Sequence, residues 1–217
     1  MVKWVVFDLS GVIFTEGFKP ACRRIATTFT LNEKAVSEYL LGEPASRYRL
    51  GEEEPAVFWR GFAETFGVQE VELAKKLFFD SYSLRGEAVE FVTRVRTVAK
   101  TAFFTFSPPD RAAYHEEKYS FLQYFDAGFY TSDVGAKKSD PVAYERLCGK
   151  LGAEPSEVLF IDDKEEYLQA AKAAGLHVVK FDLAWGFENV ASALRKLGVN
   201  VPARSEDSED DHEKIPM

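Results

Sequence analysis

Residues 4–14 of this chain read Trp-Val-Val-Phe-Asp-Leu-Ser-Gly-Val-Ile-Phe. The apolar run at residues 4–7 ends at Asp8, and Gly11 follows three residues later. Such a run followed by a glycine is typical of a buried parallel strand that opens into a tight loop. In open α/β sheets, reactive groups lie beyond the carboxyl ends of these strands. An aspartate there can also simply accept turn hydrogen bonds, so this stretch alone leaves both interpretations open.

The second half of the chain shows helical and strand-like patterns in alternation. Short apolar segments end at Gly, Pro or charged residues, and amphipathic segments lie between them. We expect strands at 101–105, 127–130, 158–161 and 177–181, and helices at 87–99, 110–121, 141–151, 165–174 and 187–197. Alternation of this kind predicts an α/β fold with a doubly wound, Rossmann-like parallel sheet.

Residues from about 19 to 80 contain helical patterns and no convincing strand. Expected helices span 19–29, a segment capped near Asn32 that ends at Gly42, a segment from Pro55 to Gly67 with an aromatic stripe, and one around 71–78. The sequence therefore predicts a small helical bundle inserted after the first strand. The expected domains are a core of residues 1–15 and 85–201, a helical cap of residues 16–84, and a disordered acidic tail of residues 202–217.

Composition limits the class of partner. A net charge of −8 disfavours nucleic acid, because binding to a phosphate backbone needs a basic face. No apolar run approaches the roughly 18 residues of a membrane span, so no membrane partner is expected. Cys22 and Cys148 lie far apart without metal-ligand spacing, which favours free thiols in a reducing, cytoplasmic setting. We expect a monomer or homodimer.

Four polar positions fall at or near expected strand ends. They are Asp8, Thr105, the loop that holds Lys138, and the pair Asp162 and Asp163. In a parallel sheet these ends share one edge, so side chains far apart in sequence can converge. The stretches Val-Val-Phe-Asp-Leu-Ser-Gly-Val, Phe-Phe-Thr, Asp-Val-Gly-Ala-Lys-Lys-Ser-Asp-Pro and Val-Leu-Phe-Ile-Asp-Asp-Lys-Glu-Glu resemble the motifs of the haloacid dehalogenase-like superfamily. Over about residues 3–198 the chain resembles its phosphatase-like members with a helical cap of the C1 type.

The resemblance implies a role for each of these residues. Asp8 is the expected nucleophile, which forms an aspartyl-phosphate that water hydrolyses. Thr105 is expected to hold a phosphate oxygen, and Lys138, favoured over Lys137 by the family spacing, to supply a fixed positive charge. The expected cofactor is Mg²⁺, held by Asp8, the backbone carbonyl of Ser10 and Asp162, with Asp163 orienting its waters.

Ser10 departs from the family pattern. Most phosphatases of this family carry a second Asp two residues after the nucleophile, where it protonates the leaving oxygen. A serine hydroxyl is a poor general acid near neutral pH. Three consequences stay open: a preference for phosphates with good leaving groups, a substitute carboxylate such as Glu16, or a protein that binds phosphate or metal without turnover.

Further residues bear on substrate choice. Phe106 stands where relatives often carry Asn and is expected to make the pocket floor more apolar. Arg47, Arg49 and Arg60 are candidates for binding a second anionic group, with surface solvation as the alternative for each. The predicted function is Mg²⁺-dependent hydrolysis of a small phosphorylated metabolite through Asp8. The alternatives are a catalytically impaired phosphate- or metal-binding protein and, less favoured by the Asp162-Asp163 pair, a 2-haloacid dehalogenase.

Overall fold

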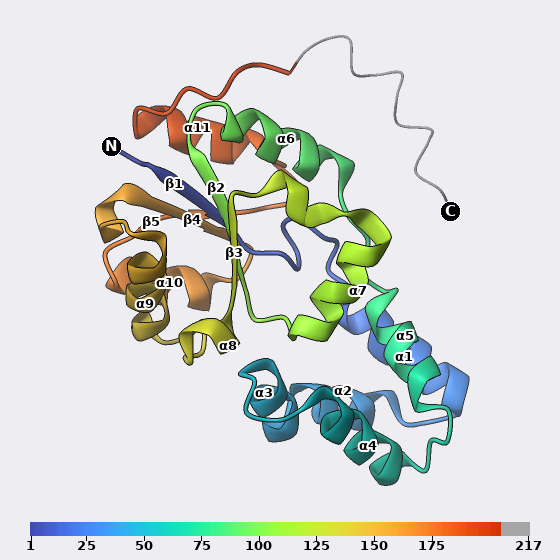
Figure 1. The fold of residues 1–217 in the computed structure, drawn as a ribbon. Coiled ribbons are helices and arrows are strands. Elements are labelled where there is room, and N and C mark those ends of the chain that lie inside the picture. Colours follow the sequence, from blue (N-terminus) through green and yellow to red (C-terminus); the bar gives the residue numbers. More distant parts are fainter. Residues whose placement is uncertain (205–217) are drawn as a thin grey trace.

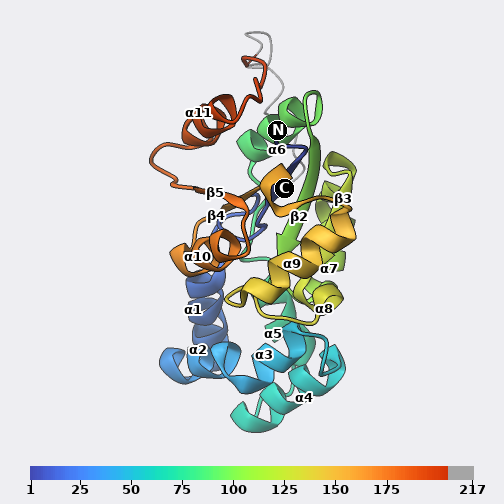
Figure 2. The same cartoon turned by 90° about the vertical axis from the view of Figure 1, so that its left-hand side faces the viewer.

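A computed structural model describes residues 1–204, which form a parallel sheet with helices on both faces and a group of helices beyond one end (Figures 1 and 2). The strands are β1 (Trp4–Phe7), β2 (Lys100–Thr105), β3 (Ala127–Tyr130), β4 (Val158–Asp162) and β5 (His177–Lys180). They lie in the order β3-β2-β1-β4-β5, and every pair is parallel. The predicted α/β class is confirmed. The order reverses between β1 and β4, which is where open α/β sheets bind ligands.

Side-chain alternation along β1 explains why helices cover both faces of the sheet. Val5 and Phe7 belong to one apolar cluster, with α6 (Gly86–Arg96) and α11 (Glu188–Lys196), whereas Val6 belongs to the cluster on the other face, with α9 (Pro141–Leu151) and α10 (Glu165–Ala173). Val5, Val6 and Phe7 are all fully buried, which accounts for the unbroken apolar run in the sequence.

Five helices are inserted between β1 and α6, and we call them the helical insert. They are α1 (Phe18–Phe29), α2 (Glu33–Leu41), α3 (Glu43–Arg49), α4 (Pro55–Phe66) and α5 (Val71–Phe79). Asn32 Oδ1 accepts a hydrogen bond from the backbone N–H of Ala35, so it caps α2 as the sequence indicates. Figure 1 shows the insert beyond the end of the sheet to which β1 leads.

Two helices were not expected from the sequence, and several boundaries differ from the prediction. Helix α3 follows α2 after a single residue, Gly42, with Pro44 in its first turn, and α8 (Thr131–Val134) has only four residues. Segments this short carry too little periodicity to be recognised. Helix α7 (Pro109–Tyr119) ends before Phe121, which lies in the 3₁₀ helix η1 (Phe121–Tyr124). A second 3₁₀ helix, η2 (Pro155–Glu157), precedes β4, and β4 includes Asp162.

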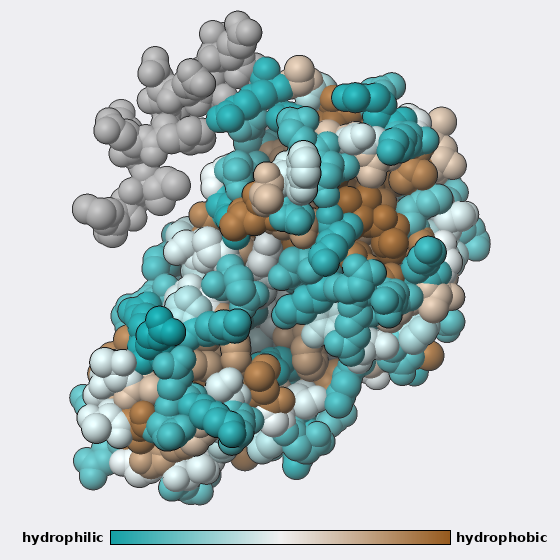
Figure 3. Space-filling view, turned by 180° about the vertical axis from the view of Figure 1, so that it is seen from behind, coloured by the Kyte–Doolittle hydropathy of each residue, from teal (hydrophilic) through white to brown (hydrophobic). Residues whose placement is uncertain are grey.

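Hydrophilic residues cover most of the face in Figure 3, and apolar residues form separate patches between them. Among residues 1–204, no helix is both long and apolar enough to cross a bilayer. Cys22 and Cys148 are buried and free, and burial raises the pKa of each thiol to about 11. The predicted tail falls mostly on residues 205–217, which lie outside the described part of the chain.

Candidate active site

The site is built around Asp8, which directly follows β1. Its backbone N–H donates to the carbonyl of Ile161 on β4 at 2.9 Å, so the sheet ladder continues to the strand end and fixes Asp8 beside Asp162. A tight loop follows, closed by a hydrogen bond from the N–H of Phe14 to the carbonyl of Leu9 at 2.7 Å. The side chains of Asp8 and Asp162 therefore meet at the point where the strand order reverses.

Lys138 joins these two carboxylates. Its Nζ lies 2.8 Å from Asp8 Oδ1 and 2.5 Å from Asp162 Oδ2, and its side chain is fully buried. The rings of Phe160 and Tyr167 lie under the ammonium, each with its centroid 4.9 Å from Nζ. The structure thus brings Lys138 into contact with Asp8, whereas Lys137 is exposed.

Burial and neighbouring charges shift the pKa values of Lys138, Asp162 and Asp163. Burial would lower the pKa of Lys138, but the charges of Asp162 and Asp8 outweigh it and raise that pKa above its ordinary value. Burial raises the pKa of Asp162 to about 7, with Lys138 opposing the rise and Asp8 adding to it. Burial and the charge of Asp8 also raise the pKa of Asp163. The charge of Asp8 thus disfavours the ionised form of both neighbouring carboxyl groups.

Three carboxylates are arranged to share a cation. Asp8, Asp162 and Asp163 each offer an oxygen, and these oxygens all lie within 4.8 Å of one another. Asp163 Oδ1 is buried and has no hydrogen-bond partner among residues 1–204. Orphaned buried oxygens are costly, and hard oxygen ligands are what Mg²⁺ prefers. The donor set therefore fits a divalent cation.

Gly11 is the position where the loop needs glycine. Its φ is +89°, and a Cβ there would lie 2.6 Å from Asp163 Oδ2, a distance that no side chain could occupy without displacing the carboxylate. The glycine in the opening stretch therefore allows Asp163 to pack against the loop that carries Asp8.

Ser10 contacts a residue that the sequence interpretation missed. Nη2 of Arg111, on α7, donates to Ser10 Oγ at 2.8 Å, and its Nε donates to Ser107 Oγ at 2.7 Å. Arg111 is only 7% exposed, and its guanidinium lies 4.1 Å from the ring centroid of Tyr82. One sequence signal was available: a cation in the first turn of a helix opposes the helix dipole, so its presence there suggests another purpose.

The remaining predicted residues divide between the site and the surface. Thr105 is buried at the end of β2, and the half-buried Phe106 follows it. The guanidinium of Arg49 lies 5.4 Å from the ring centroid of Phe106. Arg47 is exposed and pairs with Glu53 at 3.5 Å, and Arg60 is also exposed. The exposed Glu16 accepts a hydrogen bond from the N–H of Phe18.

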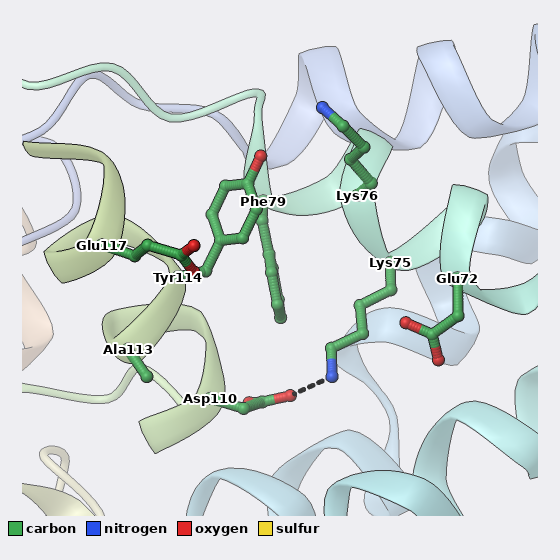
Figure 4. Close-up of a pocket in the computed structure, with 8 residues that line it drawn as sticks. All are labelled: Glu72, Lys75, Lys76, Phe79, Asp110, Ala113, Tyr114 and Glu117. Carbon is green, nitrogen blue, oxygen red and sulfur yellow. Dashed lines mark ion pairs between the residues drawn. The ribbon is translucent and has the colours of Figure 1, made fainter.

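A pocket of about 450 Å³ lies between α5 and α7, away from the carboxylate cluster (Figure 4). Lys75 on α5 points across it and pairs with Asp110 on α7 at 3.1 Å. Asp110 also accepts a hydrogen bond from the hydroxyl of Tyr48 on α3. Asp110 thus connects the helical insert to α7, one residue before Arg111.

A family model described as haloacid dehalogenase-like hydrolase matches residues 2–175. Among curated proteins, a phosphorylated carbohydrates phosphatase of Thermotoga maritima is 28% identical over 178 residues, covering 79% of this chain and 81% of that protein. An enolase-phosphatase E1 of Aquifex aeolicus is 39% identical over 54 residues, covering 25% of this chain and 24% of that protein. The matches cover less than two thirds of the length of several curated relatives.

Among solved structures, a HAD family enzyme of Bacteroides thetaiotaomicron, in complex with magnesium and inorganic phosphate, superposes with a TM-score of 0.74. The superposition covers 88% of this chain and 99% of that chain, at 16% sequence identity. At this identity the likeness is one of fold.

Proposed function

The chain belongs to the haloacid dehalogenase-like hydrolases, and we propose that it is a Mg²⁺-dependent phosphohydrolase that attacks a small phosphorylated metabolite with Asp8. The observation that carries the proposal is the contact of the buried Lys138 with both Asp8 and Asp162. A fixed cation there offsets the repulsion between a carboxylate and a phosphoryl group. The magnesium and phosphate in the Bacteroides complex and the name of the Thermotoga relative support this assignment.

In the proposed reaction, a carboxylate oxygen of Asp8 forms a bond to phosphorus while the bond from phosphorus to the ester oxygen breaks. The leaving oxygen keeps the electron pair and takes up a proton. Water then attacks the phosphorus of the aspartyl-phosphate, which releases inorganic phosphate and restores the Asp8 carboxylate. Lys138 holds positive charge beside Asp8 throughout, and Thr105 donates its hydroxyl to a phosphate oxygen.

Asp8, the carbonyl of Ser10 and Asp162 would hold Mg²⁺, whose charge would help to neutralise the phosphoryl oxygens. Asp163, whose Oδ1 is buried and has no partner in the described part of the chain, would orient the waters around it. We further propose that residues 16–84 act as a cap over a core of residues 1–15 and 85–201. The ties from Asp110 to Tyr48 and Lys75 support contact between the two parts.

The first test is phosphate release from p-nitrophenyl phosphate and acetyl phosphate, with Mg²⁺ and with EDTA. Both substrates have leaving groups that need little protonation, so Ser10 should not limit them. We expect release with Mg²⁺ and a loss of at least about 100-fold in EDTA. Absence of Mg²⁺-dependent release from both substrates would contradict the proposed function and favour a binding role.

Ser10→Asp tests the missing acid, and the contact with Arg111 sets the expected result. An aspartate at position 10 would pair with Arg111, which lowers a carboxyl pKa by about 1–3 units and keeps the group ionised. A general acid contributes about 10²–10⁴ in rate, but an ionised carboxylate cannot donate a proton. Ser10→Asp alone should therefore show little of this gain. On 2-hydroxyethyl phosphate we expect about 10-fold or less from Ser10→Asp, and a larger gain when Arg111→Gln is added.

The comparison of single and double variants is made with kcat at saturating substrate. Ser10→Asn serves as the control, because asparagine has nearly the same shape as aspartate but cannot act as a general acid. An equal gain for Ser10→Asp with and without Arg111 would show that the guanidinium does not hold position 10 in solution. A gain in neither variant would indicate that another group, such as Glu16, already supplies the proton.

A further inference from the structure

Arg111 is a buried cation with no acidic partner among residues 1–204. Its guanidinium bonds to two neutral hydroxyls, those of Ser10 and Ser107, and none of its nitrogens lies within 4 Å of a carboxylate oxygen of residues 1–204. Taking a charge out of water without a counter-charge destabilises the folded protein. A buried guanidinium that bonds only to neutral hydroxyls beside Asp8 is suited to binding an anionic group of a ligand.

Arg49 brings a second cation to the same place from the helical insert. Its Nη2 donates to the carbonyl of Leu40 at 2.7 Å, and its guanidinium lies over Phe106, the residue that follows Thr105. It too has no carboxylate oxygen within 4 Å among the described residues. Arg111 bonds to Ser107, the next residue after Phe106, so consecutive residues of one loop carry both guanidiniums. Burial and then the charge of Arg111 lower the pKa of Arg49.

The backbone near Arg49 is held against the core. The carbonyl of Arg49 accepts a hydrogen bond at 3.1 Å from the hydroxyl of Thr131, which is the first residue of α8 and is fully buried. The backbone from which the Arg49 side chain extends is therefore fixed against the core. By contrast, Arg47 on the same helix is exposed and already paired with Glu53.

We propose that Arg49 and Arg111 form a subsite for a second anionic group, so that the substrate is a small phosphate ester that also carries a carboxylate or a second phosphate. The inference rests on the proposed function, because it places the phosphoryl group at Asp8. Ser10, two residues after Asp8, is in direct contact with Arg111. The second anion would therefore lie within a few bonds of the ester oxygen, on the side of the leaving group.

The chemistry of the two side chains suits this task. Guanidinium groups bind carboxylates and phosphates through paired hydrogen bonds, and Arg111 has donors beyond the two used on the serines. Arg49 comes from the insert and Arg111 from the core, so an anion between them would draw the two parts together. A substrate that lacks the second anion would leave both guanidiniums without a counter-charge.

The test compares kcat/KM for 2-phosphoglycolate, which has a carboxylate, 1,2-ethanediol bisphosphate, which has a second phosphate, and 2-hydroxyethyl phosphate, which has neither. We expect wild type to favour at least one of the first two by about 100-fold over the third. Arg49→Gln and Arg111→Gln should each reduce that preference to about threefold or less, and Arg49→Lys should restore part of it. Arg47→Gln, the matched control on α3, should keep the wild-type preference.

Binding to the Asp8→Asn protein, measured by calorimetry in Mg²⁺ with the same three esters, tests the subsite without turnover. The preference should be present there and should fall when Arg49→Gln is added. Turnover of p-nitrophenyl phosphate by wild type, together with equal kcat/KM for the three esters, would overturn the subsite and leave the proposed function intact. Selective binding without any turnover would uphold the subsite and overturn the function.

Discussion

Asp8→Asn is expected to lower the kcat for p-nitrophenyl phosphate by about 10⁴-fold or more, with little change in the fold. Removal of a nucleophile that acts together with its neighbours has effects of this size, since the remaining groups cannot open the covalent route. Asparagine has nearly the same shape and can still accept a hydrogen bond from Lys138, which contacts Asp8 Oδ1 at 2.8 Å. The loss should therefore come from chemistry and not from unfolding.

Asp182→Asn is the matched control for this experiment. Asp182 also follows a strand of the same sheet, β5, but it is exposed, and its Oδ1 accepts a hydrogen bond from the N–H of Ala184. It should keep wild-type kcat. The measurement is steady-state phosphate release, with circular dichroism to verify folding, and a single-turnover experiment to detect phosphate on the protein. Activity of folded Asp8→Asn within about tenfold of wild type would exclude Asp8 as the nucleophile.

The parallel sheet was predictable because its strands are buried on both faces. Val5, Val6 and Phe7 all lie in the interior, so the sequence shows a continuous apolar run that ends where the polar group begins. The same pattern recurs before Thr105 and Asp162, and the convergence of these ends follows from parallel geometry alone. The order of the strands was not predicted, because pairing depends on which helices cross which face.

The contacts of Arg111 were beyond the sequence pattern for a different reason. The expected helix at 110–121 included this residue, but its direction depends on how α7 turns over the sheet edge after Pro108 and Pro109. Nothing in a periodicity argument fixes that rotation. The same holds for Arg49, because α3 itself was not expected. The spacing of residues along the sequence predicted the polar side chains at the strand ends. The positions of Arg49 and Arg111 near them depend on tertiary packing.

Lys138→Met is expected to destabilise the protein by about 3–5 kcal/mol in the absence of magnesium and to lower kcat by about 10²–10³-fold in its presence. Lys138 is the cation in contact with Asp8 and Asp162, and methionine fills a similar volume without charge. The variant would leave Asp8 and Asp162 buried without their ammonium partner, and an oxygen of Asp163 lies within 4.8 Å of an oxygen of each. Removal of one partner of a buried ion pair is costly because the other charge stays behind.

Urea unfolding in EDTA and in Mg²⁺ separates the structural from the catalytic role of Lys138. A divalent cation bound by Asp8, the carbonyl of Ser10 and Asp162 would stabilise the folded state by mass action, and it should do so more in Lys138→Met, where it also offsets the lost charge. We therefore expect added Mg²⁺ to recover part of the stability but not the rate, since the cation fixed beside Asp8 and the phosphoryl group is gone.

Lys137→Met, a change at the exposed neighbouring lysine, should stay within about 0.5 kcal/mol of wild type in both conditions. Equal stability of wild type and Lys138→Met in EDTA would show that the buried ion pairs of Lys138 with Asp8 and Asp162 do not stabilise the fold. Full recovery of kcat by Mg²⁺ would instead limit Lys138 to a structural role, because a residue that acts on the phosphoryl group cannot be replaced by a cation bound elsewhere in the cluster.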